Sequence, residues 1–165
     1  MKNGEHCQFR VKIEKAMNMY LFSLFIHITG ISIAGGTTFI SFLVNRRFWK
    51  AYGTNRDKAL TLVELSSRFP RITGLGIGLL ILSGMYIMFL TKGAFGEQLW
   101  FRIKIVLVVL VIIFNIVINI LEKRVKGMVT AEVDAGMIRR KITNYYLLQL
   151  FLFLTIFVLG VFKFN

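Results

Sequence analysis

Cysteine and proline each occur once in this chain, and acidic residues are scarce. The single cysteine, Cys7, excludes a disulfide within the chain and a zinc or iron–sulfur site built from several cysteines. Asp and Glu number 8 in 165 residues, against 21 Lys and Arg. All of the acidic residues lie outside the long apolar runs, which argues against a proton-coupled exporter built around a carboxylate inside the membrane.

Long apolar runs without an internal charge dominate the rest of the chain, of which 56% is hydrophobic. About 20 apolar residues in a helix cross a bilayer, and four runs come close to or exceed that length. We therefore predict an all-α, polytopic membrane protein with a four-helix transmembrane bundle in residues 18–165, after a polar, basic tail at residues 1–17. The predicted spans are about 19–44, 72–90, 100–121 and 145–162.

The net charge of +13 does not indicate a nucleic-acid partner, because the basic residues cluster in connections beside the spans. Lys and Arg are most frequent in residues 45–71 and 122–144. By the positive-inside rule we expect these two loops in the cytoplasm and both termini outside, in a multi-pass protein of the inner (cytoplasmic) membrane whose surroundings are lipid. The first connection has a helical apolar pattern, and Pro70 suits the start of the second span.

One ionisable residue, His27, lies inside the first apolar run. Such a residue is costly to bury in lipid and by default indicates a functional site. At helical spacing His27 belongs to a stripe of small and polar residues, which we expect to face the bundle interior. The stripe comprises Ser23, His27, Gly30, Ala34, Thr38, Ser41 and Asn45. The alternative is that these residues only allow close helix packing and local hydrogen bonds.

The second and third runs add further candidates. Gly74 and Gly78 form a G-x-x-x-G pair that indicates close contact with another helix. Met85 and Met88 follow on the same face and are candidate soft ligands for haem or copper, or ordinary packing residues. Near the start of the third span, Lys104 either snorkels to the lipid headgroups or faces inward, above Asn115 and Asn119.

The order and spacing of several motifs resemble the HemJ-type protoporphyrinogen oxidase family and related four-helix membrane proteins of the copper-resistance-D kind. Ile26-His27-Ile28-Thr29-Gly30 is similar to the family's opening L-H-I-x-G/S, and Trp100 through Lys104 to its W-x-x-x-K. Arg140 through Asn144 resembles its R-x-x-x-N, and Lys163-Phe164 its final K-P-F. The chain departs from the family at Phe114-Asn115 and at Asn144-Tyr145.

The resemblance implies a haem b associated with His27 and a functionally required lysine at Lys104. It implies protoporphyrinogen as the porphyrin substrate and the membrane quinone pool as electron acceptor. In that arrangement Ser23, Gly30 and Ala34 leave room for the macrocycle, and Asn115 stands near the site.

Three functions follow from these patterns. The first is a haem-associated redox protein, with His27 as axial ligand and Lys104 in contact with a propionate or active in proton transfer. The second is a non-catalytic subunit or assembly factor that packs against partner helices, in a homo-oligomer or a larger membrane complex. The third is copper handling by His27 with Met85 or Met88.

Overall fold

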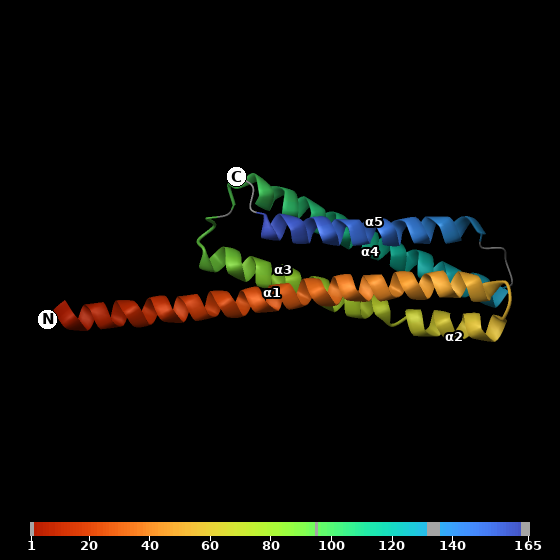
Figure 1. The fold of residues 1–165 in the computed structure, drawn as a ribbon, viewed down its shortest axis with the longest axis horizontal. Helices are drawn as coiled ribbons and strands as arrows, with labels where there is room; N and C mark the ends of the chain where they lie inside the picture. Colours follow the sequence, from red (N-terminus) through yellow and green to blue (C-terminus); the bar gives the residue numbers. More distant parts are fainter. Residues whose placement is uncertain (1, 95, 132–135, 163–165) are drawn as a thin grey trace.

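The computed structural model describes residues 2–94, 96–131 and 136–162, which form five α-helices and no strand. The helices are α1 (Lys2–Tyr52), α2 (Arg56–Ser66), α3 (Phe69–Leu90), α4 (Leu99–Ala131) and α5 (Gly136–Val161) (Figure 1). The prediction of an all-α bundle is thus confirmed. The motif at Lys163-Phe164 and the middle of the loop at 122–144 lie outside the described residues.

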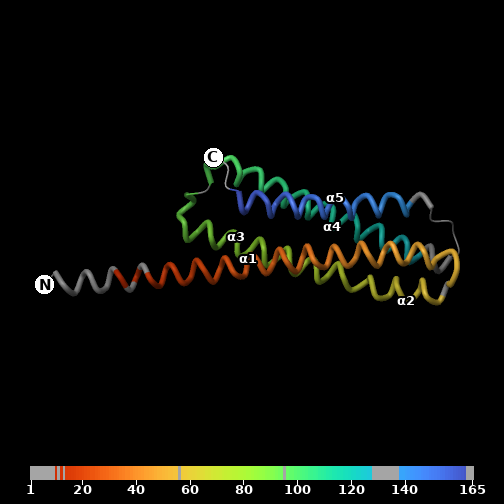
Figure 2. The backbone as a smooth tube through the Cα atoms, in the orientation of Figure 1, coloured from red at the N-terminus to blue at the C-terminus, as the bar shows by residue number. Residues whose placement is uncertain are grey.

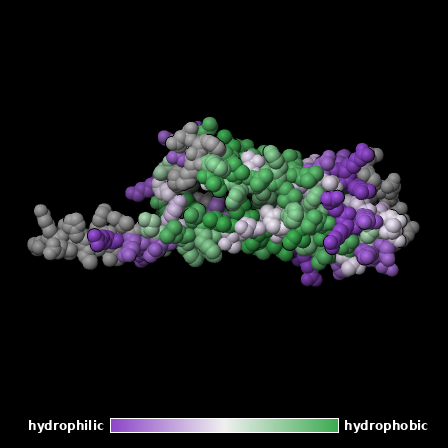
Figure 3. Space-filling model, viewed as in Figure 1, coloured by the Kyte–Doolittle hydropathy of each residue, from purple (hydrophilic) through white to green (hydrophobic). Residues whose placement is uncertain are grey.

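Four of the helices are long and apolar enough to cross a membrane: α1, α3, α4 and α5. Their outward faces carry exposed leucines, isoleucines and phenylalanines. Figure 3 shows these residues as a broad hydrophobic band around the middle of the bundle, with hydrophilic residues at both ends. A surface of this kind is stable against lipid and not against water. The protein is therefore a multi-pass membrane protein.

The first helix is longer than the predicted span. It runs without a break from Lys2 to Tyr52, so the residues predicted as a tail continue the same helix and project beyond the bundle (Figure 1). Proline is absent from this stretch, so every backbone N–H can join the helical ladder.

Both basic segments lie at the same end of the bundle, hereafter the basic end. It carries the turn after α1, all of α2, the C-terminal part of α4 and the N-terminal part of α5 (Figure 1). The predicted helix in the first connection forms as α2, with Asn55 Oδ1 accepting a hydrogen bond of 3.0 Å from the Lys58 N–H at its start. Pro70 stands at the start of α3, as predicted.

The tube in Figure 2 shows α1 and α3 side by side, and two glycines explain how closely they approach. A Cβ added to Gly30 would lie 2.9 Å from the Gly76 carbonyl oxygen, and one added to Gly76 would lie 2.7 Å from the Ala34 nitrogen. Both contacts are with backbone, which cannot rotate out of the way. The two helices therefore touch backbone to backbone, as small residues allow in membranes.

The glycines that make this contact are not those that the sequence indicated. A Cβ added to Gly74 or Gly78 would meet no other helix of the described chain within 4 Å, so this pair makes no close helix contact among the described residues. The inward face of α3 instead carries Thr73, Gly76, Ile77, Leu80 and Ser83, all of them buried. Gly74 and Gly78 lie on the other side of the helix.

A second helix pair, α4 with α5, completes the bundle (Figure 2). The two pairs share a cluster of buried side chains, hereafter the apolar layer. It consists of Ala34, Ile77, Val111, Leu152, Phe153 and Ile156. A larger apolar cluster at the basic end joins α1, α2, α4 and α5.

We expect Gly76→Ala to destabilise the protein by about 1–3 kcal/mol, because the new methyl group would push apart two backbones. Gly74→Ala is the matched control: its methyl group meets open space, and alanine is the better helix former. Thermal unfolding in mild detergent, followed by circular dichroism, compares the two. Equal midpoints for both variants would contradict the close contact.

Candidate functional site

Two serines hold His27 at the end of the bundle opposite the basic end. Ser23 of α1 is buried, and its hydroxyl donates a hydrogen bond of 3.2 Å to the Ser83 carbonyl of α3. The Ser83 hydroxyl lies 3.0 Å from His27 Nδ1. Gly84 leaves room for the ring, since a Cβ there would lie 3.3 Å from His27 Cε1. Together these residues fix the imidazole against α3.

The hydrogen bonds around Ser83 favour one tautomer of the neutral imidazole. The Ser83 hydroxyl has one proton, which it donates to the backbone of its own helix, 2.6 Å from the Leu79 carbonyl oxygen. With its proton donated in this way, the Ser83 oxygen accepts from His27, and in this arrangement Nδ1 carries the ring proton. The lone pair of the ring is consequently on Nε2. That nitrogen can bind a metal ion or accept a proton.

Lys104 lies near the start of α4, against the C-terminal end of α5. A Cβ added to Gly160 of α5 would lie 3.3 Å from Lys104 Nζ, which places the ammonium group along the backbone of that helix. The lysine is partly buried. The two ionisable candidates, His27 of α1 and Lys104 of α4, thus lie at the same end of the bundle.

The remaining residues proposed around the cofactor have other neighbours. Gly30 and Ala34 contact α3 through the close approach at Gly76, so α3 fills the space that was expected for a macrocycle. Asn115 is partly buried and lies eleven residues after Lys104. Asn115 is thus about 16 Å from Lys104 along the helix. It lies on the far side of Val111, which belongs to the apolar layer. Asn115 therefore lies apart from His27.

Neither methionine of α3 is placed as a ligand beside His27. Met85 is 65% exposed on the outer surface. Met88 is partly buried, and its Cε lies 3.7 Å from where a Cβ on Gly96 would be. Within the described part of the chain, three or more His, Cys, Asp or Glu side chains nowhere gather as a metal site would require.

The interior stripe of α1 is confirmed by burial, since Ser23, Gly30, Ala34, Thr38 and Ser41 are all buried. It does not line a single site, however. Its first members contact α3, whereas Asn45 donates a hydrogen bond of 3.4 Å to the Thr143 hydroxyl of α5.

A second group of polar side chains near the basic end was missed from the sequence. Glu122 of α4 is partly buried and accepts a short hydrogen bond from the Tyr146 hydroxyl of α5. Glu122 directly follows the predicted span at 100–121, and α4 continues past it to Ala131. The signal was available: at helical spacing Glu122 continues the face of Lys104, Asn115 and Ile118.

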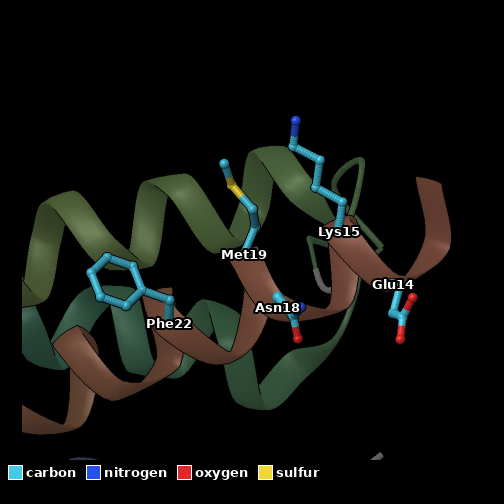
Figure 4. Close-up of a pocket in the computed structure, with 5 residues that line it drawn as sticks. All are labelled: Glu14, Lys15, Asn18, Met19 and Phe22. Atoms are coloured by element: carbon cyan, nitrogen blue, oxygen red, sulfur yellow. The ribbon is translucent and has the colours of Figure 1, made fainter. Parts of the chain in front are cut away.

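A shallow, open depression lies on the N-terminal half of α1 (Figure 4). Its lining residues are Glu14, Lys15, Asn18, Met19 and Phe22. In Figure 4 the side chains of Lys15 and Glu14 point in different directions. No shared ligand position results, so we assign this depression no chemistry.

No protein-family model, curated protein or solved structure matches the chain. The candidate site therefore stands on its own geometry.

Removing the Ser83 hydroxyl tests whether its hydrogen bond with His27 stabilises the packing of α1 against α3. We expect Ser83→Ala to cost about 1 kcal/mol, because the buried Nδ1–H would lose its partner. Thr29→Val is the control, since Thr29 donates only to the Phe25 carbonyl of its own helix. Chemical or thermal unfolding in detergent compares them. A Ser83→Ala protein as stable as Thr29→Val would show that the His27–Ser83 bond adds nothing.

Proposed function

We propose that this chain is a haem-associated redox protein of the membrane, with His27 as one axial ligand of haem b. The observation that carries the proposal is the 3.0 Å hydrogen bond between His27 Nδ1 and Ser83 Oγ. It leaves Nε2 as the basic nitrogen of the ring. Histidines that bind metals commonly donate their other ring N–H to a protein oxygen in this way, which fixes both tautomer and orientation.

His27 would bind the haem iron, and Lys104 would contact a porphyrin propionate. The edge of the ring that carries Nδ1 and Cε1 rests on Ser83 and Gly84. Lys104 supplies a cation at the same end of the interior, suited to a porphyrin propionate. The residues that would hold the group are therefore His27 and Lys104, and not Gly30 or Ala34. When bound, haem supplies one-electron transfer.

The activity that we propose follows the resemblance to the HemJ-type family: oxidation of protoporphyrinogen, with electrons passed to the quinone pool. In that reaction Lys104 holds the substrate or exchanges a proton at Nζ. His27 keeps its position through Ser83. The apolar layer, with Val111 and Ile156 buried at its centre, restricts water from the basic end.

His27→Ala tests the axial bond. We expect the protein purified without added haem to show a Soret band and sharp reduced α and β bands, and the variant to lose them while it keeps its helical circular dichroism. His6→Ala, which changes the only other histidine, is the control. A spectrum unchanged by His27→Ala would remove His27 from the site.

Lys104→Met tests the cation. We expect a loss of about 100-fold or more in protoporphyrinogen oxidation, in the range of acid–base groups, with expression retained. Lys15→Met, at an exposed position on α1, serves as the control. Wild-type rates for Lys104→Met would assign this lysine a packing or lipid-contact role.

A second candidate function is that of a membrane subunit that packs against a partner helix. It is favoured by Gly74 and Gly78, whose outward face meets no other part of the described chain within 4 Å of an added Cβ. In lipid such glycine pairs allow helices to associate closely. Two results would favour this function over haem binding. The visible spectrum would be featureless, and a partner membrane protein that co-purifies with the wild type would be lost in Gly78→Leu.

A further inference from the structure

Near the basic end a carboxyl group is held between helices. Glu122 Oε1 of α4 accepts a short hydrogen bond from the Tyr146 hydroxyl of α5. Tyr146 is buried, and the Ser41 hydroxyl of α1 lies within hydrogen-bonding reach of it. Three membrane helices thus meet at one ionisable group that the proposed redox site does not use.

Basic side chains at this end of α4 and α5 are exposed. Lys123 and Lys126 on α4 are exposed, and so is Arg139 on α5. The titratable group that faces Glu122 is Tyr146, with Ser41 behind it. The carboxyl therefore has a neutral hydrogen-bonding partner in the interior, and gaining a proton is one way to balance its charge there.

Gln149 lies one turn deeper than Tyr146 on the same face of α5. It is 1% exposed, and its Nε2 has no hydrogen-bond partner among the described residues. A buried amide without a partner is unfavourable by about 1–3 kcal/mol, and in proteins such donors are usually satisfied by an internal water molecule. Gln149 lies about 20 Å along α5 from the helix start, so water that reaches it would pass the level of Glu122.

Beyond Gln149 the interior becomes apolar. Leu152, Phe153 and Ile156 of α5 pack with Val111 and Ala34 in the apolar layer. Glu122, Tyr146 and Gln149 therefore form a line of polar groups beside the apolar cluster of the basic end, and this line ends at the apolar layer. The layer separates them from His27 and Lys104.

We propose that Glu122, Tyr146 and Gln149 form a hydrated proton-binding inlet that opens at the basic end and ends at the apolar layer. Tyr146 fixes Oε1 of the carboxyl, which leaves Oε2 to gain and release the proton. In uptake, a carboxylate and one proton from water at the basic end give the neutral acid, without a redox step. The inlet is independent of haem binding and of the proposed oxidase activity.

A purely structural role would require only the bond between Glu122 and Tyr146, with no exchange of the carboxyl proton and no water at Gln149. Two measurements on the full-length protein in lipid vesicles separate these roles.

The first measurement is labelling by dicyclohexylcarbodiimide, which couples to protonated carboxyl groups in apolar surroundings, with peptide mass spectrometry as the readout. We expect labelling of Glu122 that falls as pH rises, because the carboxylate does not react. In Tyr146→Phe the decline should move to higher pH, because the donor that stabilises the carboxylate is gone. Glu64→Gln, which changes an exposed carboxyl on α2, should leave the profile unchanged.

An unreactive Glu122 in folded protein, or labelling independent of pH, would overturn the proposal. So would protection by sodium ions at constant pH, since the carboxyl would then bind a metal cation. Tyr146→Phe keeps the carboxyl, so the test does not depend on a variant of Glu122 that folds.

The second measurement tests water access at Gln149. In a Cys7→Ser background, which has no other cysteine, Gln149→Cys is exposed to silver ions in vesicles and then unfolded and treated with N-ethylmaleimide. We expect silver to protect this cysteine. Ile156→Cys, also 1% exposed but in the apolar layer, should stay unprotected. Equal protection of both positions, or of neither, would contradict an inlet that ends between them.

Discussion

The backbone contact between α1 and α3 at Gly30 and Gly76 determines where the other polar groups of this membrane protein can lie. Because neither residue has a Cβ, the two helices approach until main-chain atoms touch. Ser23 then reaches the Ser83 carbonyl, and His27 reaches the Ser83 hydroxyl. In lipid, where water does not satisfy polar groups, this approach is what provides the histidine with a partner.

The interior is divided into two polar regions by the apolar layer around Val111 and Ile156. His27 and Lys104 belong to the region opposite the basic end, and Glu122 with Tyr146 to the region near it. An imidazole with a basic Nε2 beside a lysine suits ligand binding and proton exchange. A carboxyl with a single tyrosine donor suits proton storage. Each region combines side chains from at least two helices.

The sequence predicts the helices well, because uncharged apolar runs have few other stable structures in lipid. It also predicts the inward face of α1, since small and polar residues recur at helical spacing from Ser23 to Asn45. It does not predict which glycine of α3 contacts α1. Gly74, Gly76 and Gly78 differ only in the direction they face, and that direction is set by how α3 packs against α1. Glu122 was missed because it follows the apolar run directly, although α4 continues past it to Ala131.

The tautomer of His27 underlies the proposed axial bond. It can be measured directly by ¹⁵N NMR of haem-free protein with labelled histidine, in lipid or detergent. In a His6→Gln background all histidine signals come from His27. The account predicts a neutral ring with the proton on Nδ1 and an unprotonated Nε2, and a change in this pattern in Ser83→Ala. A ring protonated on Nε2 alone, or on both nitrogens at neutral pH, would contradict it, because no lone pair would then be directed away from α3.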